Sequence, residues 1–120
     1  MGKYTIKKKE NGASFNLVAK NGETIGVSEF YSSLDACMHG IESVKNNAPV
    51  ANVEDQTVAD FREQKHPKFV VYKDKADEFR FRLKAGNGQI ILVSEGYRSK
   101  AACLNGIESV KKNADSEVAE

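Results

Sequence analysis

The chain has 120 residues, of which 29% are charged and 40% hydrophobic, and its formal net charge is +1. This is the length of one domain, and a charge so close to zero excludes a globally basic nucleic-acid-binding protein. No apolar run approaches the roughly 20 residues of a membrane-spanning helix, and the basic N-terminus leads into no apolar signal-peptide core. We therefore expect a cytoplasmic protein that does not enter a membrane.

The first part of the chain has the pattern of three short strands. Residues 3–8 alternate apolar and polar side chains, which is typical of a half-buried strand. Two further apolar segments, 15–19 and 23–28, flank a turn at Asn21-Gly22. Two strands around Asn-Gly predict a β-hairpin.

The apolar side chains also select the length of the hairpin loop. A three-residue loop, 20–22, pairs Leu17 with Ile25 and Phe15 with Val27, which keeps these side chains on one face. A two-residue loop would mix the two faces. The second half of the chain gives the same result with a Gly86-Asn87-Gly88 loop, which pairs Leu83 with Ile91 and Phe81 with Val93.

A helix is expected after the hairpin. Ser33 can cap its N-terminus, because a serine oxygen accepts from the first free backbone amides. Cys37, Ile41, Val44 and Ala48 then recur at helical spacing and form one apolar stripe. Gly40 lies beside this stripe, where a glycine costs about 1 kcal/mol relative to alanine. We expect a close approach at that point, to the sheet or to a second helix.

The rest of the chain repeats these elements after a joint. The expected elements are a short strand within 50–53, a helical turn at 57–61, strands at 69–72, 79–85 and 90–94, and a helix over 100–113 capped by Ser99. His66-Pro67 ends the joint, because the residue before proline disfavours helix.

One stretch occurs twice and determines the architecture. Residues 40–45, Gly-Ile-Glu-Ser-Val-Lys, return as 106–111, and their flanks return with them. One copy of about fifty residues has a marginal core, so two copies are expected to share a sheet. We predict one α+β domain of tandem β-β-β-α repeats, 3–53 and 68–120, with a linker at 54–67. The repeats would be related by a pseudo-two-fold axis and would share one antiparallel sheet with both helices packed on it, giving a monomer that mimics a dimer.

These repeats resemble those of the YegP-like family of small bacterial proteins of uncharacterised function. The segments that carry the resemblance are 21–22, 28–31 and 40–49 in the first repeat and 87–88, 94–97 and 100–114 in the second. The resemblance implies a final short strand in each unit, β-β-β-α(-β), and an exchange of these last strands. The matching segments here are 50–53 and, with a less apolar sequence, 117–119 within the tail 116–120. It implies no catalytic residues.

The two cysteines, Cys37 and Cys103, hold equivalent positions in the two helices. Two cysteines without a secretory signal favour reduced thiols. Their place on the apolar stripe favours burial. We predict no metal site, because no Cys-x-x-Cys or His-x-x-x-His spacing is present.

The titratable residues do not predict an enzyme. Asn105 holds the position of His39 in the second repeat, and His66 lies in the linker. The sequence therefore places neither histidine beside a nucleophile. Glu42 and Glu108 are expected to face solvent. We therefore predict no catalytic residue and no cofactor, and we expect a binding or structural module.

One feature indicates a possible partner. Strand alternation places Arg80, Arg82 and Lys84 together on the face opposite the helices, across the hairpin from Ile90 and Leu92. Two interpretations remain open. In the first, the long stems of these side chains simply cover exposed aliphatic side chains. In the second, the row binds an anionic partner such as a nucleic acid, for which stacking aromatics are expected and only Tyr72 is nearby.

Overall fold

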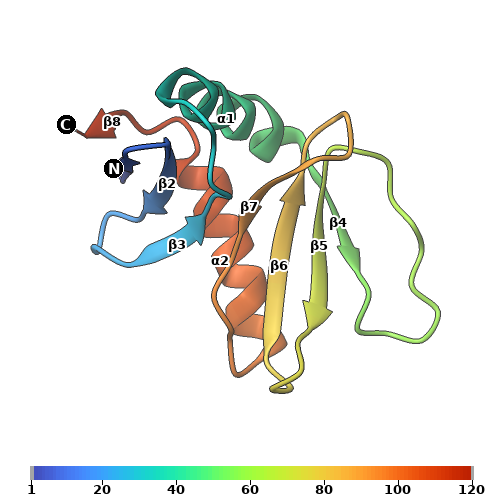
Figure 1. The fold of residues 1–120 in the computed structure, drawn as a ribbon. Helices are drawn as coiled ribbons and strands as arrows, with labels where there is room; N and C mark the ends of the chain where they lie inside the picture. The colour runs from blue at the N-terminus through green and yellow to red at the C-terminus, as the bar shows by residue number, and fades with distance from the viewer. Residues whose placement is uncertain (1, 120) are drawn as a thin grey trace.

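The computed structural model of the protein describes residues 2–119 (Figure 1). In this part of the chain the strands are β1 (Lys3–Lys9), β2 (Gly12–Val18), β3 (Thr24–Val27), β4 (Asn52–Asp55), β5 (Lys68–Lys73), β6 (Phe79–Lys84), β7 (Ile90–Val93) and β8 (Val118–Ala119). The helices are α1 (Leu34–Asn47) and α2 (Lys100–Asn113), and a short 3-10 helix, η1 (Ala48–Val50), follows α1.

All the described strands form one sheet in the order β4-β5-β6-β7-β3-β2-β1-β8. The two halves meet where β3 pairs antiparallel with β7, at Val27 and Val93. These residues are 66 positions apart and hold the same place in the two repeats, so a pseudo-two-fold axis passes between them. The predicted α+β fold of two tandem repeats is confirmed.

The outermost strands are exchanged between the halves. β4, which follows the first helix, pairs with β5 of the second repeat, and β8 pairs with β1 of the first. Both pairings are parallel, so the sheet is antiparallel only in its interior, and the prediction of a wholly antiparallel sheet is wrong at its two edges. β4 is joined to β5 by residues 56–67 rather than by a tight turn, and a connection of this length lets the chain return to the end at which β4 began, as a parallel pair requires.

Both hairpins have the predicted three-residue loop. Gly22 and Gly88 have φ angles of 88° and 85°, which glycine adopts without steric cost. The predicted register beyond the loops is wrong by one residue, however. A bulge shifts it, so that Leu17 pairs with Gly26 and Leu83 with Leu92. A bulge places two residues of one strand opposite one of its partner, so adjacent residues of β3 and of β7 both become buried.

The bulge gives Leu92 a place in the shared core. Its side chain is fully buried, whereas the sequence pattern placed it on the exposed face. A Cβ atom at Gly26, the equivalent residue, would lie 2.6 Å from the Leu92 side chain. Leu92 therefore occupies space that a second leucine would need at the pseudo-two-fold axis, and the glycine is required for that reason.

The helices start as predicted. Ser33 and Ser99 accept from the backbone N–H of Ala36 and Ala102, at 3.0 and 3.1 Å. The apolar stripe of each helix is buried in a core that it shares with β1, β2, β5 and β6. Ile41, Val44, Ile107 and Val110 are each at most 1% exposed. The helices thus cover one face of the sheet, and we call the opposite face the helix-free face.

The helix glycines make room for a tyrosine. A Cβ atom at Gly40 would collide with the hydroxyl oxygen of Tyr31, and one at Gly106 with that of Tyr97. Each tyrosine lies just before its helix and stacks on a core phenylalanine, Phe15 or Phe81. The close approach expected from the sequence is therefore made by a side chain of the same repeat.

The joint between the repeats differs from its prediction in two ways. Val50 belongs to η1, and the strand lies later, at Asn52–Asp55, where the chain can reach β5. Residues 57–61 form turns and bends rather than a helical turn. They have no apolar stripe to bury, and tertiary packing is the main source of stability for a short helix.

The predicted burial of the cysteines is confirmed, since Cys37 and Cys103 are both 0% exposed. Burial raises the pKa of both thiols, that of Cys103 to about 11. Because the thiolate is the reactive form, we expect a thiol reagent to label the native protein slowly and the urea-unfolded protein rapidly. The measurement is the labelling rate at pH 8, and prompt labelling of one native cysteine would contradict it.

Candidate anion-binding surface

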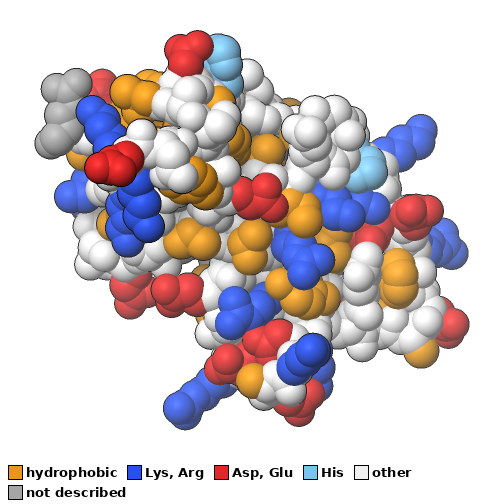
Figure 2. Space-filling model, in the orientation of Figure 1, with side chains coloured by type: hydrophobic (Ala, Val, Ile, Leu, Met, Phe, Trp, Pro, Cys, Tyr) orange, Lys and Arg blue, Asp and Glu red, His pale blue; other side chains and the backbone are white. Residues whose placement is uncertain are grey.

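The structure brings Arg80, Arg82 and Lys84 onto the helix-free face of β6. Phe81 and Leu83, which alternate with them, are fully buried on the helix side. The cations are half-buried rather than fully solvated. Figure 2 shows Lys and Arg side chains lying over β5, β6 and β7, with hydrophobic and acidic side chains between them.

Arg80 is held by an acidic turn residue. Its Nε donates to Asp74 Oδ2 at 2.6 Å, and its Nη1 donates to the backbone oxygen of Ser94 at 3.2 Å. Asp74 Oδ1 also accepts from the backbone N–H of Ala76 and Glu78 in the turn between β5 and β6. The hydrogen bond from Arg80 is the main cause that lowers the pKa of Asp74. Much of the charge on Arg80 is thus offset within the protein.

Arg82 is held differently, because it lies on an aromatic ring. Its guanidinium carbon lies 4.2 Å from the centroid of the Tyr72 ring, on the neighbouring strand β5. Within residues 2–119 it makes no ion pair and no side-chain hydrogen bond. A stacked guanidinium is fixed in position while the N–H groups at its edge stay free to donate.

These side chains border an open hollow of about 560 Å³ at the end of the β5–β6 hairpin. Its lining residues are Tyr72, Lys73, Asp74, Lys75, Ala76, Arg80 and Arg82. Four of these are cationic and one is anionic. The hollow therefore favours a negatively charged group, and the Arg82 edge is the donor best placed to meet it.

One part of the predicted surface is wrong. Of the two aliphatic residues expected beside the cations, Leu92 is buried in the core because of the bulge, and only Ile90 remains partly exposed, opposite Lys84. Arg82 faces Val93 instead. Arg82 still lies between two aliphatic residues, Val93 on β7 and Val70 on β5.

The sequence reasoning missed a second group of cations on the same face. Lys3, Lys7 and Lys9 alternate with the inward-facing Tyr4 on β1 and are all exposed. They lie roughly 19 Å from β6, four strand spacings away. The sequence feature that indicates this group is the lysine-rich strand pattern of residues 3–9, in which Lys3, Lys7 and Lys9 share one face.

A buried ion pair joins β4 to β5. Lys68 Nζ lies 2.8 Å from Glu54 Oε1, and the two side chains are 5% and 1% exposed. Glu54 also accepts from the backbone N–H of Gln64 and from the side chain of Gln56, each at 2.7 Å. The joint after β4 is thereby folded back onto the sheet, and its carboxylate is fully satisfied.

The buried Glu54 carboxylate predicts that the protein becomes less stable in acid. Burial alone would raise the pKa of Glu54, but the hydrogen bond from Lys68, those from Gln64 and Gln56, and the Lys68 charge outweigh it and lower the pKa to about 2. A depressed carboxyl pKa stabilises the fold above the unfolded-state pKa, and this contribution is lost as the pH falls from about 4.5 to about 2. We expect about 3 kcal/mol of wild-type stability to disappear over that range.

The measurement is the free energy of urea unfolding from pH 6 to pH 2 for wild type and Glu54→Gln. Other carboxylates, including Asp55 and Asp74, also have lowered pKa values, so only the difference between the two proteins isolates Glu54. This difference should shrink as the pH falls. A difference that is constant with pH would contradict the assignment.

The described residues hold no cluster of three or more His, Cys, Asp or Glu side chains that could bind a metal ion. His39 and His66 are exposed and lie on separate elements, and Glu42 and Glu108 face solvent. No described helix is long and apolar enough to span a membrane.

Comparison with known proteins places the chain among relatives without an assigned function. The family model described as "Domain of unknown function (DUF1508)" matches residues 9–55 and again 74–120. The UPF0339 protein YegP of Yersinia pestis is 43% identical over 119 residues, which cover 98% of this chain and 93% of that protein. A Stutzerimonas stutzeri relative, "UPF0339 protein in ptx operon 5'region", is 74% identical over 46 residues, which cover 38% of this chain and 41% of that protein.

The fold is also known from a solved structure. The solution NMR structure of a UPF0339 protein from Shewanella oneidensis matches with a TM-score of 0.77 and 36% identity, over 98% of this chain and 89% of that one. The two matches of the family model and this structural match agree with the resemblance drawn from the repeats. The chain therefore belongs to the DUF1508 (UPF0339) family and carries two copies of its domain.

Proposed function

We propose that this protein is a binding module that holds an anionic partner, such as single-stranded nucleic acid, on the helix-free face of its second repeat. The observation that carries the proposal is the Arg82 guanidinium, stacked on Tyr72 and free of any ion pair within the described chain. Arg80 and Lys84 flank it on the same strand. We assign Arg82 the largest contribution, since Asp74 already offsets the charge of Arg80.

The geometry supports contact with phosphates rather than readout of bases. Arg82 lies on the ring of Tyr72, so that ring face is not open to a base. Binding through Lys and Arg to phosphates is independent of sequence and weakens steeply with salt. The lysines of β1 would extend the same contact for a longer polymer.

The test is a titration of labelled single-stranded RNA and DNA at several salt concentrations. The triple variant Arg80→Ala, Arg82→Ala, Lys84→Ala is expected to lower the slope of log affinity against log salt by about 2, and Arg82→Ala alone should weaken binding more than Arg80→Ala. Asn16→Ala is the matched control, because Asn16 holds the position of Arg82 in the first repeat. Equal binding by the triple variant and Asn16→Ala would contradict the proposal.

We also propose the domain organisation, the oligomeric state and the location of the protein. We propose one domain, with repeats at 3–53 and 68–120 and a linker at 54–67, that acts as a monomer in the cytoplasm and without catalysis. The exchange of β4 and β8 supports a monomeric protein, because each repeat supplies an edge strand to the other repeat's half of the sheet. Two buried free cysteines suit a reducing compartment.

A further inference from the structure

The two edges of the sheet are built from equivalent segments but are covered to different extents. β4 pairs with four residues of β5, from Lys68 to Val71, and the backbone N–H of Gln56 then donates to Val71 at 2.8 Å. Within the described residues, β8 pairs with two residues of β1, Tyr4 and Thr5. Val71 is fully buried as a result, whereas Ile6, its equivalent, is only partly buried.

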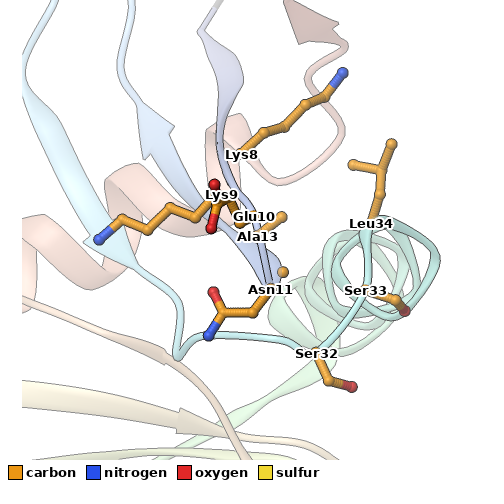
Figure 3. A pocket seen from close by; sticks show the side chains of 9 residues that line it. Lys8, Lys9, Glu10, Asn11, Ala13, Ser32, Ser33 and Leu34 are labelled. Atoms are coloured by element: carbon orange, nitrogen blue, oxygen red, sulfur yellow. The ribbon is translucent and has the colours of Figure 1, made fainter.

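Beside β8, an apolar groove runs between β1 and the first turns of α1. It has a volume of about 780 Å³ and is lined by Ile6, Lys8, Leu34, Met38, Val118 and Ala119. Leu34 and Met38 are 43% and 38% exposed. Leu104, the equivalent of Met38, is exposed to the same extent, so the groove differs from its counterpart in the second half at Leu34, which replaces Lys100. The groove continues past Lys8 and Leu34 toward Asn11 and Ser33, and Figure 3 shows Lys8 and Leu34 projecting into the same opening from β1 and α1.

The other half of the molecule shows what fills the equivalent place. There β4 continues along β5, and Asp55 Oδ2 lies 2.8 Å from Lys100 Nζ at the start of α2. Lys100 is 66 positions after Leu34 and holds the same place in its helix. An extended segment parallel to the edge strand thus covers this position in the second half. In the first half a leucine replaces the lysine, so the matching side chain would be apolar.

We propose that the edge of β1 from Ile6 to Lys9 binds an extended segment of another protein as an added parallel strand, with apolar side chains on Leu34 and Met38 and carboxylates toward Lys7 and Lys9. Backbone hydrogen bonds supply affinity in this mode, and alternate side chains supply specificity. Lys8 and Lys9 point to opposite sides of β1 in Figure 3, as the alternation requires. The bound segment therefore alternates apolar and acidic residues.

The lysines of β1 also explain why this edge does not simply aggregate. Charged side chains, especially lysines, are a common means of keeping sheet edges from pairing with one another. Lys7, Lys8 and Lys9 repel a second copy of β1, which carries the same charges, but attract a strand that carries carboxylates. The same residues exclude one partner and select another.

The experiment uses a fluorescein-labelled octapeptide of alternating Val and Glu, with a Val–Lys octapeptide for comparison, and measures anisotropy against the full chain. Wild type and Leu104→Glu should bind the Val–Glu peptide equally, and Met38→Glu should bind it at least about tenfold more weakly. Leu104 is the matched control, because it is the equivalent of Met38 and is also 38% exposed. Amide NMR shifts should concentrate at residues 6–9 and 34–38.

Several results would overturn the proposal. These are no binding of the Val–Glu peptide at about millimolar concentration, equal binding by Met38→Glu and Leu104→Glu, or equal binding of the Val–Lys peptide. A dimer that is lost in Met38→Glu would show that a second copy covers the groove, and would also overturn it. Equal melting temperatures of the two variants would confirm that loss of binding is not loss of folding.

Discussion

Replacement of Lys68 by methionine is expected to destabilise the protein by about 3–5 kcal/mol. The substitution leaves the Glu54 carboxylate 1% exposed and without its counter-charge Lys68, with hydrogen bonds from Gln56 and Gln64 as its partners among the described residues. A buried charge without a partner is far more costly than a buried pair. The measurement is the free energy of urea unfolding at pH 7.

Two comparisons separate this effect from a general loss of lysine. Lys3 is the equivalent residue of the first repeat and is exposed, so Lys3→Met should change the unfolding free energy by less than about 0.5 kcal/mol. The double variant Glu54→Gln, Lys68→Met removes both charges and should recover much of the lost stability. Equal effects of Lys3→Met and Lys68→Met would contradict the assignment.

The architecture was predictable because it depends on sequence features that occur in both repeats. The serine caps at 33 and 99, the helical stripes and the left-handed glycines of the two hairpins all follow from local physical chemistry. Each is set by neighbours in sequence, so no knowledge of distant contacts is needed. Each pattern found in the first repeat can be checked against the second repeat.

The register of the hairpins was not predictable, because it depends on contact across the pseudo-two-fold axis. The bulge buries Ile25 with Gly26 and Ile91 with Leu92. A strict alternation rule cannot bury adjacent residues of one strand. The decisive fact is that Leu92 fills the space beside Gly26, and these residues belong to different repeats.

The candidate site, like the fold, was predictable only in part. Alternation was enough to place Arg80, Arg82 and Lys84 on one face, since their buried neighbours fix the phase of β6. The partners of these cations were not predictable, because Asp74 lies in a turn and Tyr72 on another strand. The buried Glu54–Lys68 pair was missed because its partners come together only when β4 crosses to the second repeat.

We infer that neither repeat of this protein is complete without the other. In a fragment of residues 68–120, β5 would lack β4, β7 would lack β3, and β8 would have no β1 to pair with. A sheet half with two open edges and a core of about fifty residues is marginal. A homodimer would close both open edges, because β8 of each copy could pair with β5 of its partner, as β4 does in the intact chain, and the two β7 strands could pair with each other, as β3 and β7 do.

The most direct measurement is the mass and far-ultraviolet circular dichroism of the 68–120 fragment across micromolar concentrations. Interlocked repeats predict either an unfolded monomer or a folded homodimer that loses its structure on dilution. A monomer that stays folded on dilution would contradict the claim that the two repeats form one indivisible fold.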